Sequence, residues 1–286
     1  MSRVAWVNGR FRPRQRAAIP IDDRAVLFAD SVYEVCEVFG GALVDLTAHL
    51  DRLDRSLREL AMAAPMGRRA LTVVMRETAR RNRVRDGMVY VQVSRGAAPR
   101  DFLFPDPPAK PTLIVTARSI DRAAAEARAV QGMAVITTPD IRWGRVDIKT
   151  TGLLPNVLAK EAARLRGARE AWLTDRDGFI TEGGSSNAWI ITQAGVLVTR
   201  PADGGILRGV TRGTLLRLVQ EMGLPVEERA FTRAEALAAR EAFVTAATTL
   251  VAPVIRIDDE AIGDGRPGAL TLELRRRLHD VAEMAA

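Results

Sequence analysis

The sequence is poor in the residues that build metal centres and disulfide bonds. Its 286 residues include one cysteine, Cys36, and two histidines, His49 and His279. A single cysteine excludes an internal disulfide, a cysteine-based zinc site and an iron–sulfur cluster. Two histidines leave little room for a two-histidine metal site or a histidine-driven triad. We therefore expect no metal cofactor, and the lack of disulfides favours a cytoplasmic protein.

Long apolar runs are also missing. No run approaches the roughly 18 apolar residues that a membrane span needs. The N-terminal segment MSRVAWVNGRFRPRQR lacks the apolar stretch of a signal peptide. Hydrophobic residues make up 47% of the chain and charged residues 27%, which is close to globular averages and excludes disorder, collagen-like repeats and coiled coils. The sequence predicts a globular protein without a membrane partner.

Lysine is scarce although the chain is basic. The formal net charge is +7, from 42 basic and 35 acidic residues, and only three of the basic residues are lysines. The arginines are interleaved with Asp and Glu, as in RLDRSLREL and LELRRRLHD, which is typical of solvated helix faces. A basic nucleic-acid-binding protein is therefore a distant alternative. It would bind DNA or RNA in a salt-sensitive manner.

The alternation of strands and helices predicts two α/β (α+β) domains. Residues 1–120 contain the apparent hairpins AWVNGRF and SVYEVCEVFGGALVDL, helices near 47–63 and 67–82, and the strands MVYVQVSRG and TLIVTAR. The polar, alanine-rich stretch 121–132 is the predicted linker. Residues 133–286 form a larger C-terminal domain, whose last helix is expected over 268–285. A ligand is expected in the groove between the domains.

Scarce lysine narrows the search for reactive groups. Arginine hardly ever deprotonates, whereas a lysine amine can lose its proton and attack a carbonyl to form a Schiff base. Lys110 lies in the proline-rich loop DPPAKP and Lys160 lies beside Glu161 on a helix, so both are interpreted as surface charges. Lys149 lies among apolar residues in RWGRVDIKTTGLLPN and is the best candidate for a Schiff base.

Three other segments carry polar groups at predicted turns and helix starts. Glu182 lies in GFITEGGSSNAWIIT between two apolar strands. Val210 and Thr211 begin the helix of GGILRGVTRGTLLRL, where free amides and a hydroxyl can hold a phosphate dianion. Thr248 and Thr249 follow the strand EAFVTAA. A lysine, a carboxylate and a set of phosphate-holding groups are together what pyridoxal phosphate requires.

Seven ordered segments resemble one enzyme family over nearly the whole chain. The chain resembles the class IV (fold type IV) pyridoxal-phosphate aminotransferases, and D-amino-acid transaminases most of all. The segments are DDRAVLFADSVYEV, HLDRL, VSRGAAPRDFLFP, PDIRWGRVDIKTTGLLPNVLAK, TEGGSSN, GILRGVTR and AATTLVAPV. The resemblance implies a two-domain homodimer that binds pyridoxal 5'-phosphate. It also implies ping-pong transfer of an amino group from a D-amino acid, such as D-alanine, to a 2-oxo acid, such as 2-oxoglutarate.

The resemblance implies roles for residues around the cofactor. Lys149 would join the cofactor covalently and move the proton at the substrate α-carbon, and Glu182 would contact the pyridine nitrogen. Leu207 would pack against the ring. Arg52, in HLDRL, would bind the phosphate together with backbone and hydroxyl groups of four further residues. These four residues are Val210, Thr211, Thr248 and Thr249.

The resemblance also implies a substrate site and shows where this chain departs from the family. Tyr33 and Arg100 would surround the substrate carboxylate, and Arg142 would lie near the Tyr33 side of the cofactor. Phe102 stands where D-amino-acid transaminases commonly have a histidine, so one carboxylate donor is missing and the pocket wall becomes more apolar. A shifted range of D-substrates, or activity toward a primary amine, follows. The common G-D-G segment is Ala29-Asp30-Ser31 here.

Other members of the same family remain as alternatives. A branched-chain L-amino-acid aminotransferase shares the lysine and the glutamate, and would prefer L-leucine to D-alanine as amino donor. An (R)-amine transaminase would accept a primary amine. An aminodeoxychorismate lyase would release pyruvate without any oxo-acid acceptor. Sequence comparison with the segment VSRGAAPRDF favours the D-amino-acid transaminase.

Overall fold

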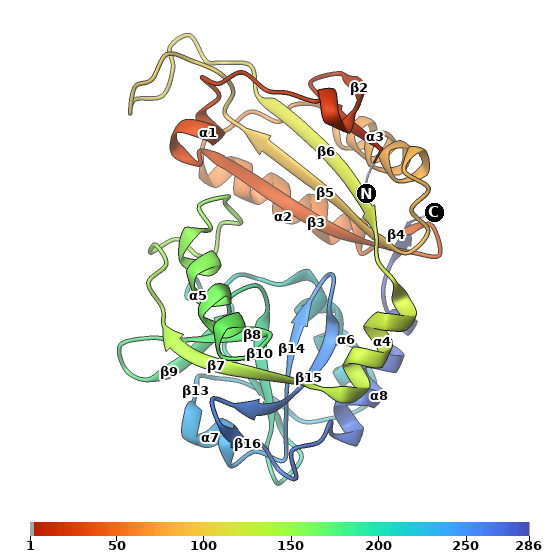
Figure 1. Ribbon diagram of the computed structural model, residues 1–286, viewed down its shortest axis with the longest axis vertical. Coiled ribbons are helices and arrows are strands. Elements are labelled where there is room, and N and C mark those ends of the chain that lie inside the picture. Colours follow the sequence, from red (N-terminus) through yellow and green to blue (C-terminus); the bar gives the residue numbers. More distant parts are fainter. Residues whose placement is uncertain (1–2, 286) are drawn as a thin grey trace. The chain divides into compact units, whose positions relative to one another are not determined.

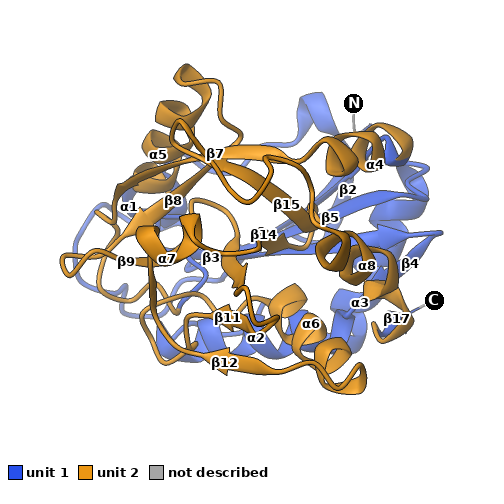
Figure 2. Ribbon diagram, turned by 90° about the horizontal axis from the view of Figure 1, so that it is seen from below, with its two compact units in different colours: residues 1–122, 148–152, 283–286 blue, residues 123–147, 153–282 orange. Residues whose placement is uncertain are grey.

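The computed structural model, which describes residues 3–285, divides the chain into two units (Figure 2). Unit 1 holds the described residues up to Arg122, the segment Ile148–Gly152 and the described residues from Glu283 onward. Unit 2 holds Ala123–Asp147 and Leu153–Ala282. Both units combine helices with a sheet, in agreement with the expected mixed α/β class. Residues 1, 2 and 286, at the ends of the predicted domains, lie outside the described residues.

Unit 1 is built on an antiparallel sheet in the order β17-β4-β3-β5-β6-β1-β2 (Figure 1). Its strands are β1 (Val4–Val7), β2 (Arg10–Pro13), β3 (Ser31–Phe39), β4 (Ala42–Val44), β5 (Gly87–Ser94), β6 (Thr112–Ser119) and β17 (Met284–Ala285). The helices of this unit are η1 (Arg14–Arg16), α1 (Arg24–Phe28), α2 (Leu46–Glu59) and α3 (Arg68–Arg81).

The core of unit 1 lies between this sheet and the two longer helices. Leu50, Leu53 and Leu57 recur on α2 at helical spacing and are all buried. They meet alternate residues of the strands, such as Val89 and Val115, because side chains of a strand point to its two faces in turn. Each such buried side chain contributes roughly 2 kcal/mol of transfer free energy. The hydrophobic spacing of the sequence therefore predicted this packing correctly.

Unit 2 is built on a mixed sheet in the order β12-β11-β10-β14-β15-β7-β8-β9-β13, with β16 paired to β15. Its strands are β7 (Met133–Pro139), β8 (Glu170–Thr174), β9 (Phe179–Gly183), β10 (Asn187–Ile191), β11 (Leu197–Thr199), β12 (Val226–Glu228), β13 (Phe231–Thr232), β14 (Glu241–Ala246), β15 (Leu250–Ile257) and β16 (Glu260–Ala261). Its helices are α4 (Arg122–Gln131, whose first residue belongs to unit 1), α5 (Leu154–Leu165), α6 (Val210–Glu221), α7 (Arg233–Leu237), α8 (Ala269–Arg277) and η2 (Leu278–Asp280).

The inner strands of the unit 2 sheet, such as β8, β10 and β14, are buried on both faces. All five residues of β10 are buried, as expected for a strand covered on two sides. Trp189 and Phe243 stack with ring centroids 5.5 Å apart and pack with Leu215 and Leu218 of α6. None of the helices in the described residues is both long and apolar enough to cross a membrane.

Two segments have a secondary structure that differs from the sequence-based prediction. The stretch expected as a linker, 121–132, is mostly the helix α4. The predicted helix over 268–285 ends at Arg277, because Glu283 exchanges hydrogen bonds with Asp45: Asp45 N donates to Glu283 O at 2.8 Å, and Glu283 N donates to Asp45 Oδ1 at 3.1 Å. These bonds return the C-terminal residues to unit 1, where β17 pairs with β4.

Candidate active site

The segment that carries Lys149 is held against β3 of unit 1. Lys149 accepts a hydrogen bond at its carbonyl from Tyr33 N at 3.0 Å, and Thr151 N donates to Ser31 O at 3.0 Å. The hydroxyls of Ser31 and Thr151 also bond to each other. The sequence-based boundary placed these residues in the C-terminal domain. They lie in unit 1 because this short antiparallel bridge satisfies their backbone groups.

The amine of Lys149 stands over an aromatic ring. Its Nζ lies 4.3 Å from the centroid of the Tyr33 ring, and the side chain is half-buried. The Tyr33 ring lies 5.7 Å from that of Tyr90, whose hydroxyl donates to Gln92 Oε1 at 2.8 Å. Burial raises the pKa of Tyr90 to about 12, so this phenol stays protonated. The structure therefore brings together the predicted Schiff-base lysine and the predicted substrate-site tyrosine.

Arg52 is paired with a carboxylate that the sequence analysis did not single out. Arg52 donates to Glu34 through Nε at 2.8 Å and Nη2 at 2.7 Å. His49 Nδ1 lies 2.7 Å from the same carboxylate, and both histidine and glutamate are buried. Burial alone would raise the pKa of Glu34, but Arg52 and His49 outweigh it and lower the pKa from 4.5 to about 2. Glu34 is therefore an anion that fixes the direction of the Arg52 fork.

In unit 2, Glu182 on β9 is held by Arg142. Arg142 Nη1 donates to Glu182 Oε1, and its other two nitrogens donate to Asp140 at 2.9 and 2.7 Å. Burial disfavours the guanidinium charge, but Asp140 and Glu182 outweigh burial and raise the pKa of Arg142. The pKa of Asp140 is lowered, because hydrogen bonds from Arg142 and Thr181 exceed the effect of burial. The arrangement keeps Glu182 ionised beside a fixed cation.

Two more donors orient the same carboxylate. Asn187 Nδ2 donates to Glu182 Oε2 at 2.9 Å and to Leu207 O at 3.0 Å. Leu207 N donates to Glu182 Oε1 at 3.1 Å. A Cβ on Gly209 would lie 2.0 Å from Asn187 Oδ1, so any other residue there would force the Asn187 side chain to move. Leu207, which is predicted to pack against the cofactor ring, is thus hydrogen-bonded directly to Glu182, which is predicted to contact the ring nitrogen.

The predicted phosphate-holding groups of unit 2 lie at two turns. Val210 and Thr211 are the first residues of α6, whose N-cap Gly209 has no side chain to accept from their amides. Such amides at the positive end of a twelve-residue helix suit an anion. Thr248 and Thr249 lie in the turn between β14 and β15. Arg275 donates to Thr249 O at 2.6 Å, which holds this turn in place.

Arg100 and Phe102 lie on the long loop between β5 and β6 of unit 1. Both are exposed, Phe102 to 79%. The Arg100 guanidinium lies 5.3 Å from the Phe28 ring centroid and 5.6 Å from that of Phe102. Two aromatic rings, Phe28 and Phe102, therefore stand beside the predicted carboxylate-binding arginine. Of these, Phe102 occupies the position where the family commonly has a histidine.

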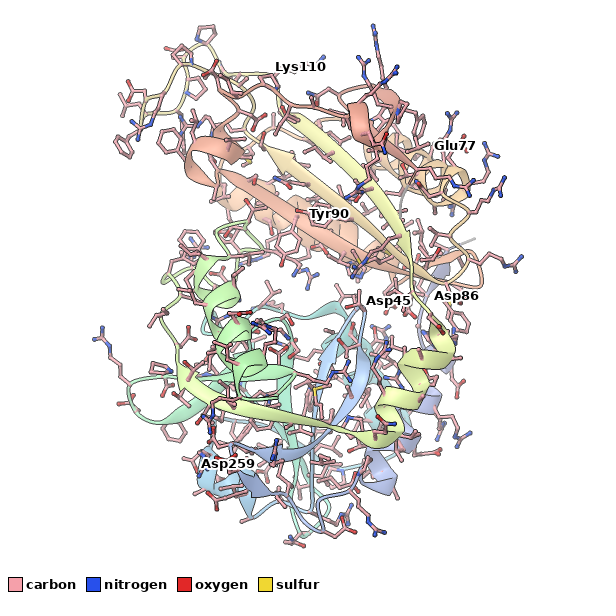
Figure 3. The ribbon with its side chains drawn as sticks, in the orientation of Figure 1. Asp45, Glu77, Asp86, Tyr90, Lys110 and Asp259 are labelled. Carbon is pink, nitrogen blue, oxygen red and sulfur yellow. The ribbon has the colours of Figure 1, made fainter. Side chains whose placement is uncertain are left out.

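The other two lysines differ from Lys149. Lys110 is exposed on the loop before β6 (Figure 3), as predicted. Lys160 is not a simple surface charge: its Nζ lies 3.1 Å from the buried Glu170 and donates to Arg169 O at 2.7 Å. No group of three His, Cys, Asp or Glu side chains among residues 3–285 could hold a metal ion.

Several residues of the site escaped the sequence analysis. Glu34, Asp140 and Asn187 all touch a predicted site residue, but the chain has 35 acidic residues, and the immediate neighbours of Glu34 and Asn187 do not mark them. A usable signal existed for Asp140, which lies two residues before Arg142. Asp-x-Arg in a turn brings opposite charges within bonding distance, as the Arg142 Nε to Asp140 Oδ1 bond of 2.9 Å shows.

Comparison with known proteins decides the family. The family model described as "Amino-transferase class IV" matches residues 31–257. This range contains every candidate residue of both units. The chain belongs to the class IV aminotransferases. The resemblance stated from the sequence is thereby confirmed, and pyridoxal phosphate is the cofactor of this class.

Individual relatives match over nearly the full length. A D-alanine aminotransferase of Bacillus licheniformis is 40% identical, covering 96% of this chain and 95% of its own. One of Staphylococcus epidermidis is 36% identical, with 95% of each chain covered. Among solved structures, the branched-chain aminotransferase of the archaeon Thermoproteus uzoniensis with norvaline is 25% identical. Its TM-score is 0.85, with 97% of this chain and 94% of that chain covered.

The described residues fit pyridoxal phosphate in three respects. Lys149 offers a primary amine beside an aromatic ring. Glu182 offers a carboxylate that Arg142 keeps ionised, which suits a protonated ring nitrogen. The start of α6, with glycine at the N-cap, offers amides without a side-chain acceptor. Each type of group that the cofactor needs is therefore present within one unit or the other.

Proposed function

We propose that this class IV aminotransferase moves an amino group from a D-amino acid, such as D-alanine, to a 2-oxo acid, such as 2-oxoglutarate. The observation that carries the proposal is the naming of full-length relatives, 36–40% identical, as D-alanine aminotransferases. Tyr33 and Arg100 support it, because they match the residues that D-amino-acid transaminases use around the substrate carboxylate.

We assign the chemistry to Lys149, Glu182 and their neighbours. When bound, the cofactor draws electrons away from the α-carbon of the substrate. Lys149 Nζ would act as the general base that takes the α-proton of the substrate, and would deliver that proton to C4′ of the cofactor. Glu182 holds a proton on the ring nitrogen, and Arg142 keeps Glu182 anionic. Arg52, the start of α6 and the Thr248–Thr249 turn bind the phosphate, while Leu207 packs on the ring.

The substrate is oriented by groups of unit 1 in this proposal. Arg100 pairs with the α-carboxylate, and Tyr33 lines the same site beside Lys149. Phe102 forms an apolar wall in place of a second carboxylate donor. Since the hand of the substrate depends on where its carboxylate is anchored relative to Lys149, Arg100 and Tyr33 favour the D form.

Turnover assays test the proposal directly. Purified protein reconstituted with pyridoxal phosphate should convert D-alanine plus 2-oxoglutarate to pyruvate and glutamate, with parallel double-reciprocal lines. Lys149→Ala should abolish turnover, while Lys110→Ala, an exposed control, should not. Intersecting lines or activity with L-alanine alone would contradict the assignment. Pyruvate released from aminodeoxychorismate without any oxo-acid acceptor would instead indicate a lyase.

A branched-chain L-amino-acid aminotransferase is the second candidate, because the Thermoproteus uzoniensis structure named as a branched-chain aminotransferase is 25% identical with a TM-score of 0.85. The same assay separates the two activities, since L-leucine replaces D-alanine as donor. An (R)-amine transaminase would instead use a primary amine that has no carboxylate for Arg100.

We also propose that the protein acts as a cytoplasmic homodimer. Support comes from large apolar side chains left exposed in each unit, such as Ile21 at 82% in unit 1 and Leu154 at 68% on α5 in unit 2. A second copy of the chain would cover such side chains. Light scattering during size-exclusion chromatography measures the molar mass of the protein. A monomer at micromolar concentration would refute the proposed dimer.

A further inference from the structure

The carboxylate of Asp30, whose side chain is 12% exposed, joins two arginines near the loop that carries Arg100. Asp30 Oδ2 accepts from Arg24 Nε and from Arg95 Nε, both at 2.7 Å, and Asp30 Oδ1 accepts from Arg95 Nη2 at 3.1 Å. The side chains of Arg24 and Arg95 are only 4% and 9% exposed. Ion pairs that are largely shielded from water are costly to separate, so the side chains of Arg24, Asp30 and Arg95 form one rigid cluster.

Arg24 extends from this cluster to the backbone on both sides of Phe102. Its Nη1 donates to the carbonyl of Asp101 at 2.7 Å and to that of Leu103 at 3.2 Å. The same guanidinium lies 4.7 Å from the centroid of the Phe28 ring. One arginine therefore fixes the backbone around Phe102, although Asp101 to Phe104 are all exposed.

Arg95 anchors the other end of the cluster. It donates to the carbonyls of Leu60 at 2.8 Å and Ala61 at 3.2 Å, at the end of α2, and lies 3.6 Å from the centroid of the Phe104 ring. The loop is thus tied to the helix layer of unit 1 through Asp30. An exposed loop without regular structure would otherwise sample many conformations.

We propose that Arg24, oriented by Asp30, is a positioning residue that presets the segment 100–102 for the α-carboxylate of the amino acid. The proposal rests on the role given above to Arg100. The Arg100 guanidinium lies 5.3 Å from the Phe28 ring centroid and 5.6 Å from that of Phe102, and the two rings are 5.4 Å apart. It therefore stands beside both rings, so fixing the backbone of Phe102 also restrains the Arg100 guanidinium. A preset donor loses less conformational entropy when substrate binds.

Arg24→Lys tests the proposal, because lysine keeps the charge but cannot bond Asp30 and two carbonyls in one plane. We expect the KM for D-alanine to rise about tenfold while kcat changes less than about threefold, as the loss of one charge-assisted bond implies. Chymotrypsin should cleave the folded protein after Phe102 about tenfold faster. The dissociation constant of pyridoxal phosphate should stay within about twofold.

The matched control is Arg68→Lys, an exposed arginine of unit 1 that pairs with Asp51 and Asp54. It should leave all three measurements unchanged. If Arg24→Lys does not fold, Asp30→Asn replaces it, since Asn keeps the shape but removes the charge that orients Arg24. An unchanged KM and cleavage rate, or a KM rise matched by equal loss of cofactor affinity, would overturn the proposal.

Arg100→Gln separates this inference from the proposed function. If Arg100→Gln raises the KM and Arg24→Lys does not, the positioning role of Arg24 is wrong while the role of Arg100 stands. If Arg100→Gln leaves the KM unchanged, the assignment of Arg100 to the carboxylate is wrong. The cleavage assay then still reports whether Arg24 holds the loop, but positioning for substrate is refuted.

Discussion

Asn187 holds Glu182 by a hydrogen bond of 2.9 Å from its Nδ2 to Oε2. The same nitrogen donates to the carbonyl of Leu207 at 3.0 Å, so one amide links the proposed ring-nitrogen partner to the proposed ring-packing residue. The opposite atom, Oδ1, lies where any side chain on Gly209 would stand. Three separate segments of unit 2 thus depend on the position of one side chain.

Gly209→Ala should displace that side chain. The added Cβ would lie 2.0 Å from Asn187 Oδ1, so Asn187 must move and its bond to Glu182 weakens. We expect a loss of about 1–3 kcal/mol in unfolding free energy and weaker binding of pyridoxal phosphate. Gly213→Ala on the same helix is the control, because nothing lies within 4 Å of its Cβ. It should stabilise the protein by about 0.5–1 kcal/mol.

Denaturant titration measures the unfolding free energy of the two variants, and cofactor fluorescence measures their binding of pyridoxal phosphate. Similar results for Gly209→Ala and Gly213→Ala would contradict the clash between position 209 and Asn187.

The buried Glu34 should make stability depend on acid pH. Its pKa falls from 4.5 to about 2 on folding, so its contribution is complete above pH 4.5 and disappears as the pH falls toward 2. Relative to Glu34→Gln, the native protein should therefore be more stable by on the order of 3 kcal/mol at pH 7. That difference should shrink steadily below pH 4.5 in urea titrations.

Glu77 provides the comparison for this pH dependence. Hydrogen bonds from Arg80 and Arg81 also lower the pKa of Glu77 to about 2, but the pair stands on the surface of α3 (Figure 3). Water and salt screen such exposed pairs, so the lowered pKa of Glu77 contributes little to the free energy of unfolding. Glu77→Gln should change stability little at any pH. An equal effect of the two substitutions would refute the special position of Glu34.

Ala29 should tolerate glycine better than a helical alanine does. It closes α1 with φ +55°, a left-handed conformation that costs a non-glycine residue about 1 kcal/mol or more. Ala29→Gly removes this cost and adds unfolded-state entropy, so we expect no loss or a gain of up to about 1 kcal/mol. Ala127→Gly, at an exposed position within α4, should lose about 1 kcal/mol. Thermal unfolding of both variants measures the contrast, and an equal loss would show that Ala29 is not strained.

The fold was largely predictable because it depends on local periodicity. The leucines at 50, 53 and 57 predict α2, and Gly40–Gly41 predicts the turn between β3 and β4; both elements are present. Helix ends were less predictable. The predicted helix over 268–285 ends at Arg277, because Glu283 bonds to Asp45, which is more than 200 residues away and invisible to a local pattern.

The site was predictable where a residue type is rare. Lys149 could be found because the chain has three lysines, and its roles followed from the resemblance. Asp140 and Asn187 were missed, since their importance comes from contacts with Arg142 and Glu182 that only the folded chain makes. Arg24 was hidden among 39 arginines. Burial and partners, rather than residue type, distinguish these three.

Phe102→His should strengthen binding of the substrate carboxylate. Phe102 stands beside Arg100 on a loop whose backbone Arg24 holds, so an imidazole there can supply the second donor that the chain lacks. We expect the KM for D-alanine to fall roughly fivefold, equivalent to about 1 kcal/mol for one added hydrogen bond. Because a histidine titrates near ~6.5, the gain should be larger at pH 6 than at pH 8.

Leu103→His is the control for this gain, since Leu103 is the exposed neighbour of Phe102 but has no ring contact with Arg100. Its KM should match that of the native protein at both pH values. Equal effects of the two histidines would mean that general positive charge on the loop attracts the substrate. An unchanged KM in Phe102→His would instead place position 102 away from the carboxylate, and would remove Phe102 from the substrate site while leaving Lys149 and Glu182 unaffected.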